Sequence, residues 1–558
     1  MKKEGEFTLT LLTTLILYTP VIRLSCRYTK GTSKTISRHM LAYHGLTNTN
    51  QGRAFKKLKG DPVPSTLLLK WLVGSFLPVS IVEDESWKKI GGIHSATEDE
   101  LLQWVACEVD RVKLRLRSIL VTCDQYSVSV EIDSPVMDER YCTVKVTFCT
   151  STERKCLTLA VQELSKEETA NQVIERVLKE YDLSTDKIIS VTTKGEDEVI
   201  LRTVPKEMHR TCVLYEMDTL LVTALSSGKV GDLIDELATH VKSYYGYTKS
   251  GNLFLKLPLD FDPRVKSTKN VYMLLQKYKT AQTPIEVEAT ASKSTWTASA
   301  EQEYMIQVLK TTLKPFYDAF DTLEKTPFPT VGLSIPILRR IRDVLNEIKV
   351  DKSACDNEII LSTITDFLNS LKKSFASKFA SILGEDPMLV WTVPLDPRLI
   401  DMRGLSEQEQ ASVKQKLIKK VQDCRLSKSS EEEKIEETQE EDSGSKDNSN
   451  KTESSTMGGI FWERGDEEQS LKDMAAAYAT STVDRYFSIV KTHRRIDDPL
   501  QWWNSNEHQF PELRQLAGMW FGASPIFEAS TEDKRNRYFG ENLDMIAFLH
   551  ENLDLICD

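Results

Sequence analysis

The spacing of apolar residues changes along the chain, and each change predicts a different element. Residues 65 to 115 carry apolar positions at helical spacing. From Asp124 onward, the runs SVSVEID, YCTVKVTFC and CLTLAVQEL alternate between apolar and polar residues, which is typical of an antiparallel meander. The run SKEETANQVIERVLKEYDL has an N-cap signature and an apolar stripe, so it predicts an amphipathic helix. KIISVTTK then predicts a buried strand.

The pattern is helical again from about 265 to 425 and in the C-terminal stretch. Asp498 before Pro499 fits an N-cap with proline at the first helical position, and Phe510-Pro511 repeats the device. A last helix is predicted from Asn542 to Ile556. Six aromatic residues gather in this short region: Trp502, Trp503, Phe510, Trp520, Phe521 and Phe548. They fit an ordinary helical core or a surface that a second copy covers.

Charge is distributed unevenly along the chain. The 558 residues carry a net charge of −11, yet residues 1 to 60 hold eleven Lys or Arg against two acids, which makes this end +9 and the remainder −20. A basic arm on an acidic body is typical of a protein whose one end meets a polyanion. Between Glu431 and Asp442 there are eight acids and one lysine, a composition that predicts a disordered loop.

Two further features bear on the compartment. The ten cysteines are scattered, without a CxxC pair, which predicts reduced thiols in a cytosolic or nuclear protein. Phe7 to Ile22 is apolar and follows two lysines, as in a signal peptide. Glu4 and Glu6, the lack of a cleavage pattern and Pro20 argue instead for a strand or a frayed end, and the stretch is short for a membrane span.

Three stretches carry a resemblance to a known family. DDPLQWWNSNEHQFPEL, followed by ENLDMIAFLHENL, resembles the C-terminal dimerisation region of hAT-type transposases and of the BED-finger proteins derived from them. WTVPLDPRLIDMRGL resembles the family's Leu-Asp-Pro-Arg segment, and LLLKWLVGSFLPVSIVEDESWKKI resembles its N-terminal helical region. The resemblance implies an α/β fold in which a ribonuclease H-like core is interrupted by a large helical insertion.

The resemblance and the patterns together predict six regions. These are a basic arm with a partial BED-type finger (1–60), a helical linker domain (61–115), the first part of the ribonuclease H-like core (116–264), a helical insertion (265–426), an acidic disordered loop (427–465) and the C-terminal dimerisation region (466–558).

Ser25 to Gly45 resembles the second half of a BED zinc finger. Cys26, His39 and His44 stand at positions of zinc ligands, but the partner cysteine is missing, because Arg23 and Thr29 occupy the places three residues on either side. Structural zinc sites have four ligands. Three alternatives therefore stay open: an impaired zinc site, a site completed by a ligand from elsewhere, and a pair of histidines that binds no metal. The expected DNA-binding residues are Arg27, Lys30, Lys34 and Arg38.

The acidic catalytic positions of the family are altered. Two-metal phosphoryl chemistry needs clustered carboxylates. The resemblance places Glu131 at the first acid and Lys194 at the second, with Asp133 where the family has Trp. A protonated lysine repels Mg²⁺, and Glu528 is a poor substitute for the third acid. We therefore predict that the chain keeps the ribonuclease H-like fold but lacks the two-metal catalytic activity.

The sequence thus predicts a domesticated, catalytically inactive hAT transposase-like protein of the nucleus. We expect it to homodimerise and to bind DNA or chromatin, as in transcription regulation, with neither a small-molecule substrate nor a membrane. The alternatives are an active hAT transposase and a non-functional element remnant. The expected dimerisation residues are Pro499, Leu500, Trp502, Trp503, Phe510, Pro511, Leu513, Leu516, Phe548 and Leu549, although inward packing would leave a monomer.

Overall fold

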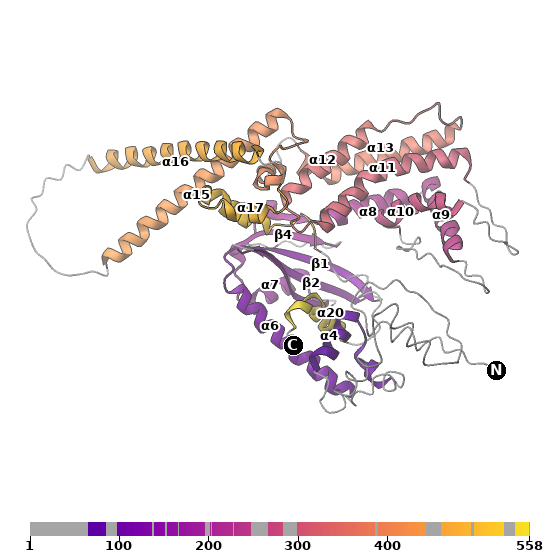
Figure 1. Cartoon of the computed structure of the whole chain (residues 1–558), viewed down its shortest axis with the longest axis horizontal. Helices are drawn as coiled ribbons and strands as arrows, with labels where there is room; N and C mark the ends of the chain where they lie inside the picture. Colours follow the sequence, from indigo (N-terminus) through magenta and orange to yellow (C-terminus); the bar gives the residue numbers. More distant parts are fainter. Residues whose placement is uncertain are drawn as a thin grey trace, which may run out of the picture. The chain divides into compact units, whose positions relative to one another are not determined.

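The computed structural model separates into two compact units, each of which is considered by itself. The residues that the structure describes are 65–84, 97–136, 139–150, 153–165, 167–195, 201, 204–226, 228–246, 266–282, 298–384, 389–441, 459–492, 496–528 and 542–556. One unit holds Met1–Leu72, Pro78–Trp104 and Cys557–Asp558, and the other holds Val73–Leu77 and Val105–Ile556. Figure 1 traces the chain. Among the described residues, no helix combines the length and the apolar character that crossing a membrane requires.

The described part of the smaller unit is helical. It contains most of α4 (Ser65–Ser75), the short 3-10 turn η1 (Val79–Glu83) and the beginning of α6 (Glu98–Leu120). The helices predicted between residues 65 and 115 are therefore confirmed, and α6 continues into the larger unit.

A five-stranded sheet lies in the larger unit. Its strands are β1 (Tyr126–Val136), β2 (Glu139–Cys149), β3 (Arg154–Leu164), β4 (Ile188–Lys194) and β5 (His209–Thr211). The order across the sheet is β3-β2-β1-β4-β5, in which β1, β2 and β3 are antiparallel, β4 runs parallel to β1, and β5 runs parallel to β4. The predicted meander and buried fourth strand are confirmed. β5 was not predicted, because three residues are too few to show a period.

Helix α7 (Ala170–Glu180) forms the crossover between the meander and β4. Thr169 caps it, since the Thr169 side chain accepts from the Gln172 amide and Gln172 reaches back to the Thr169 amide. Its buried residues include Val173, Ile174 and Val177, and the helix packs on β2 and β3. The predicted amphipathic helix is confirmed together with its capping box.

The two faces of the sheet differ in chemistry, although both are buried. Val128 and Val130 point to one face with their β2 partners. The opposite face carries polar residues that are buried too, namely Ser127, Ser129, Glu131, Thr143, Lys145, Thr147, Thr158, Ser190 and Thr192. Alternating strands usually leave their polar face in water, so something must cover this face.

The helices that follow β5 share one hydrophobic core. They are α8 (Val213–Leu225), α9 (Gly228–Gly246), α10 (Thr268–Gln282), α11 (Ala300–Lys325), α12 (Val331–Glu347), α13 (Glu358–Lys378) and the short α14 (Ala380–Leu383). This core includes buried residues between Cys212 and Phe379 together with Ile526 and Phe527, so the boundary predicted at residue 265 divides a single packed body. The helical layer instead begins at α8, because the buried residues of α8 and α9 belong to this core.

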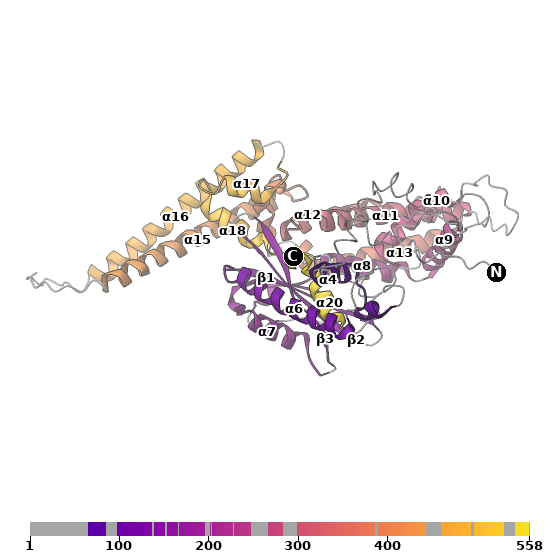
Figure 2. The ribbon, with the colours of Figure 1, turned by 60° about the horizontal axis from the view of Figure 1, so that its bottom comes forward.

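A second helical core joins segments far apart in the sequence. It includes parts of α12, the 3-10 turns η4 (Val390–Leu395) and η5 (Pro397–Leu399), α15 (Glu407–Glu441), α16 (Gly459–Thr492), α17 (Pro499–Ser505) and α18 (Pro511–Phe521). Helices α15 and α16 contact each other (Figure 2), and Figure 1 shows that they diverge at the ends far from α17. Helix α20 (Leu543–Glu551) and the turn η6 (Leu553–Leu555) complete the described chain and replace the single helix predicted from 542 to 556.

The loop predicted between residues 427 and 465 is corrected at both ends. α15 continues to Glu441 and α16 begins at Gly459, so these parts are helical, and residues 442–458 lie outside the described residues. Glu and Lys are good helix formers, and an earlier part of α15 contacts α16. The Gln422 side chain, for example, donates to the Lys472 carbonyl at 3.1 Å.

Candidate functional site

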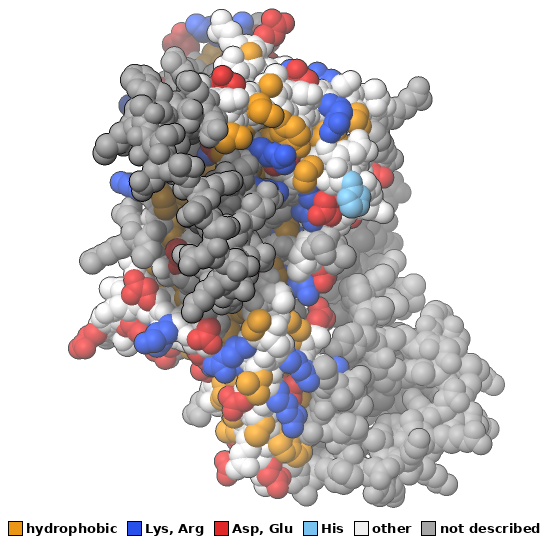
Figure 3. Space-filling model, turned by 90° about the vertical axis from the view of Figure 1, so that its left-hand side faces the viewer, with side chains coloured by type: hydrophobic (Ala, Val, Ile, Leu, Met, Phe, Trp, Pro, Cys, Tyr) orange, Lys and Arg blue, Asp and Glu red, His pale blue; other side chains and the backbone are white. Residues whose placement is uncertain are grey.

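The predicted zinc and DNA-binding residues lie outside the described part of the chain. This applies to Cys26, His39 and His44, and to Arg27, Lys30, Lys34 and Arg38. Their roles therefore stay predictions, and so does the interpretation of Phe7–Ile22. No group of three or more His, Cys, Asp or Glu that could hold a metal ion occurs within the described ranges. On the face drawn in Figure 3, the described Lys and Arg side chains are interspersed with Asp and Glu.

The positions that resemble the first two catalytic acids lie side by side in the sheet. Glu131 on β1 is the register partner of Lys194 at the end of β4. The Lys194 ammonium donates to Glu131 Oε1 at 2.6 Å. The Glu131 side chain is fully buried, whereas that of Lys194 is 25% exposed. Because parallel pairing of β1 with β4 joins the two residues, the strand pattern alone could not show this contact.

This pair has a direct chemical consequence. A cation already occupies the carboxylate that the resemblance assigns to metal binding. A divalent ion would have to displace the ammonium from a buried group, and its charge would repel the lysine at close range. Two-metal chemistry also needs several carboxylates within reach of two ions. The arrangement can hold one charge pair, and among the described acids no third group completes a metal site.

Glu528, the poor substitute for the third acid, is paired with a cation as well. The Arg154 guanidinium donates to Glu528 through Nη1 at 2.8 Å and through Nη2, which makes a bidentate pair. Arg154 Nε also donates to the Phe521 carbonyl at 2.7 Å. The Arg154 side chain is buried and that of Glu528 is partly exposed. Arg154 therefore fastens both the end of α18 and the segment that holds Glu528 to β3.

The C-terminal part of the chain covers the polar face of the sheet. Thr192 on β4 donates to the Ser524 carbonyl at 2.8 Å. Lys145 on β2 donates to the Glu528 carbonyl at 3.1 Å and pairs with Glu551 at 2.6 Å, and both of these charged side chains are buried. Asn552 donates to the Thr158 carbonyl at 2.9 Å. A nucleic-acid backbone could reach this face only if these contacts opened.

The stretch that resembles the dimerisation region packs into the chain's own core. Of the residues Pro499, Leu500, Trp502, Trp503, Phe510, Pro511, Leu513, Leu516, Phe548 and Leu549, nine are buried and Pro511 is half-buried. The Tyr486 ring stacks on Trp503 with 5.1 Å between centroids. The packing argument for a homodimer, in which half of these aromatic side chains face a partner, is therefore wrong. Homodimerisation itself stays a prediction.

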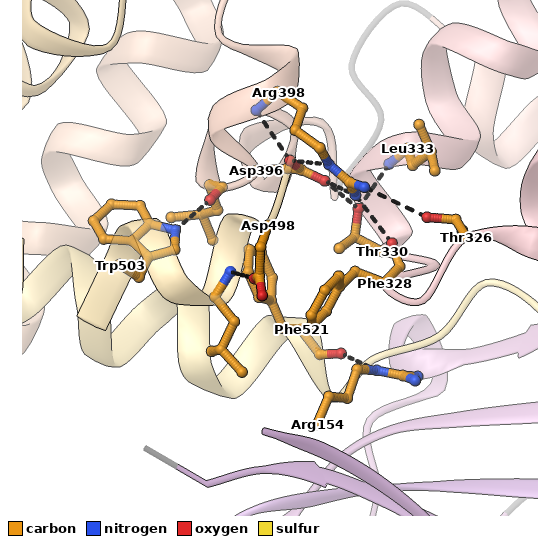
Figure 4. Close-up of polar contacts among 12 residues, drawn as sticks. Arg154, Thr326, Phe328, Thr330, Leu333, Asp396, Arg398, Asp498, Trp503 and Phe521 are labelled. Carbon is orange, nitrogen blue, oxygen red and sulfur yellow. Dashed lines mark hydrogen bonds and ion pairs between the residues drawn. The ribbon is translucent and has the colours of Figure 1, made fainter. Parts of the chain in front are cut away.

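The Leu-Asp-Pro-Arg segment and the tryptophan-rich stretch meet in this core. Trp503 Nε1 donates to the Leu395 carbonyl at 2.8 Å, and Asp498 caps α17 by accepting from the Leu500 and Gln501 amides. Figure 4 shows the Trp503 contact and one of the Asp498 cap contacts beside Asp396. The predicted N-cap with Pro499 as the first helical residue is thus confirmed.

A second set of contacts anchors the same segment to the start of α12. Arg398 donates to both Asp396 oxygens, at 2.8 and 2.6 Å, and to the Phe328 carbonyl at 3.1 Å. Thr330, the N-cap of α12, donates to Asp396 at 3.3 Å. Two of the stretches that carry the family resemblance therefore form one structural unit, in which their polar groups hold the chain in place.

Fold and site together define a mixed α/β protein, mostly helical, whose candidate acidic centre is occupied by internal ion pairs. No family model matches the sequence. A human protein described as zinc finger BED domain-containing protein 4 is 24% identical to this chain over 268 residues. The match covers 46% of this chain and 21% of that protein, so it spans about a fifth of the relative's length.

Proposed function

We propose that this chain is a catalytically inactive, hAT transposase-like nuclear protein that binds DNA or chromatin and self-associates, in the manner of a transcription regulator. The observation that carries the loss of catalysis is the buried Glu131–Lys194 pair at the position of the family's acids. The Arg154–Glu528 pair supports it at the third position. The 24% identity to a human protein named for its BED zinc finger supports DNA binding and the nucleus.

The proposed core is ribonuclease H-like. Its support is the order of elements, in which a three-strand antiparallel meander is followed by a helix and a fourth strand that returns parallel to β1. The helices between β5 and the C-terminal stretch correspond to the proposed insertion. In this proposal the sheet serves as a scaffold, since its charged polar groups are used for internal pairing.

DNA affinity is assigned to residues 1–60, whose net charge is +9. With three zinc ligands in place of four, Cys26, His39 and His44 do not make a closed site by themselves. Affinity therefore comes mainly from phosphate contacts, and sequence specificity is low. Each neutralised phosphate makes the slope of log K against log salt more negative by about 0.9.

The catalytic part of the proposal is tested with the full-length protein on branched and linear DNA, with Mg²⁺ or Mn²⁺. We expect neither strand cleavage nor strand transfer. Cleavage that is lost in the Glu131→Ala variant, and kept in a Lys187→Ala control on the protein surface, would refute the assignment. Cleavage that Glu131→Ala leaves unchanged would point to a contaminating nuclease, and the preparation would be repeated until that activity is removed.

The DNA-binding part is tested by fluorescence anisotropy over a range of salt concentrations. A variant in which Arg27, Lys30, Lys34 and Arg38 are all replaced by Ala should bind more weakly and show a shallower salt slope, by up to about 3.6 units if each residue contacts one phosphate. A matched variant removes four lysines from the exterior of the larger unit. Equal losses in both variants would contradict a binding site within residues 1–60.

A further inference from the structure

The outer face of α6 carries apolar side chains that the proposed function does not use. Cys107 is exposed, Leu114 is 62% exposed, and Val121 is 84% exposed. Val121 follows α6 directly, and its amide donates to the Arg117 carbonyl at 3.1 Å, which continues the helical turn. These three residues are seven apart, so they lie along one line of the helix.

The inner face of α6 is separate from this line. Val112, Leu116 and Leu120 are buried and face the rest of the larger unit. On the inner side, Arg117 Nε also donates to the Glu180 carbonyl at the end of α7, at 3.1 Å. Since these contacts already hold α6 in place, the exposed line is not needed for folding of the single chain. Such a line is typical of a surface that a second helix covers.

Charges beside the line are arranged in a self-complementary way. Asp110 is exposed and takes part in none of the ion pairs of the described chain. Its neighbour Arg111 is 68% exposed and pairs with Glu108 on its own helix. The exposed acid thus precedes the exposed base along the helix axis. Two such helices attract each other when they run antiparallel, because each acid then faces the other copy's base.

We propose that α6 pairs antiparallel with α6 of a second copy of this chain, across a twofold axis between Asp110 and Arg111. In this register Asp110 faces Arg111 of the second copy, and Cys107 faces Leu114 of the second copy. Both contacts occur twice, as an isologous interface requires. The inference rests on the proposed self-association and assigns its surface, in place of the buried C-terminal aromatics.

Charge selects this surface over the other exposed apolar pair in the described chain. Leu471 and Met474 on α16 are 48% and 68% exposed. The surrounding run from Asp466 to Asp473 carries four acids and one lysine. Two copies would therefore repel each other along α16, whereas the charges of α6 favour a second copy. A single helix pair is smaller than the roughly 800 Å² per partner of a standard interface, so we expect a dissociation constant of about micromolar or weaker.

Charge reversal with complementation tests the pairing. Sedimentation of the full-length protein between about 1 and 200 μM should show a monomer–dimer equilibrium. Asp110→Arg alone places two bases against each other, and Arg111→Asp alone places two acids against each other, so each should weaken dimerisation at least tenfold. An equimolar mixture of the two variants should form heterodimers. Asp232→Arg on α9, a charge reversal at another exposed residue, should leave dimerisation unchanged.

The outcomes separate the surface from the proposed self-association. A wild-type protein that stays monomeric throughout would overturn both. A dimer that Asp110→Arg does not weaken would overturn the α6 surface and leave self-association standing. Weakened single variants whose mixture stays monomeric would overturn the antiparallel register in which Asp110 faces Arg111 of the second copy. Equal thermal unfolding of all variants would show that the changes act on association, and the recovered heterodimer is a readout that misfolding could not produce.

Discussion

Replacing Lys194 by methionine should destabilise the larger unit, because it removes the ammonium from the buried Glu131 carboxylate. Methionine keeps most of the volume of the lysine stem but carries no charge. At the observed 2.6 Å, two unit charges attract by about 6 kcal/mol at an effective dielectric constant of 20. This attraction is partly offset by the cost of removing both groups from water.

The net magnitude follows from burial. Breaking a buried pair by removing one partner costs about 3 to 5 kcal/mol, and the 25% exposure of the Lys194 side chain places this case near the lower limit. We therefore expect a loss of about 3 kcal/mol in the free energy of unfolding. For a unit that extends from Val105 to Ile556, an unfolding entropy of about 2 cal/mol/K per residue converts this loss to a Tm lower by about 3 °C.

The assay is thermal and urea unfolding of three variants beside the wild type. Lys194→Met should lose stability, while Glu131→Gln combined with Lys194→Met should recover most of it, because the double variant has no buried charge at this place. The surface control Lys187→Met should stay within about 0.5 kcal/mol. A single variant as stable as the wild type, or a double variant no better than the single one, would refute the reasoning.

Two further predictions concern ionisation. The hydrogen bond from Arg339 holds the pKa of Glu409 at about 2. The resulting stabilisation is present above the ordinary value of 4.5 and is lost as the pH falls toward 2, so Glu409→Gln should flatten stability in this range when urea unfolding is measured. Burial raises the pKa of Cys142 and of Cys149 to about 12. Alkylation at pH 8, followed by peptide mass spectrometry, should therefore label Cys107 well before either of them.

Local signals predicted much of the fold. The capping residues Thr169 and Asp498 mark the helix starts that the structure has, since a cap satisfies amides within three residues and needs no distant partner. The alternation of apolar and polar residues predicted β1 to β3, because this alternation is also a local signal. Sequence reasoning misses the end of α15, because it interprets acidic composition as disorder, whereas glutamate and lysine are good helix formers.

The partner of the aromatic cluster could not be predicted, because its contacts are distant in sequence. Trp503 meets Leu395, which lies 108 residues earlier, and together with Tyr486 it belongs to the core that also includes α12. Apolar spacing says that a helix face is buried but not which surface buries it. The six aromatic residues therefore predicted burial, but not whether the chain's own core or a second copy buries them.

The candidate centre shows the same limit for polar residues. Alternation predicts that the Ser127, Glu131 and Lys145 face of the sheet meets water, yet segments from the opposite end of the chain cover it. Lys145 and Glu551 are 406 residues apart, and Arg154 and Glu528 are 374 apart. Each buried charge needs a partner of opposite sign, so the cations on the sheet and the acids at the C-terminus depend on each other. Lys194 beside Glu131 therefore belongs to a face whose charges are paired within the protein. For this reason we expect these residues to stabilise the fold rather than to bind a metal.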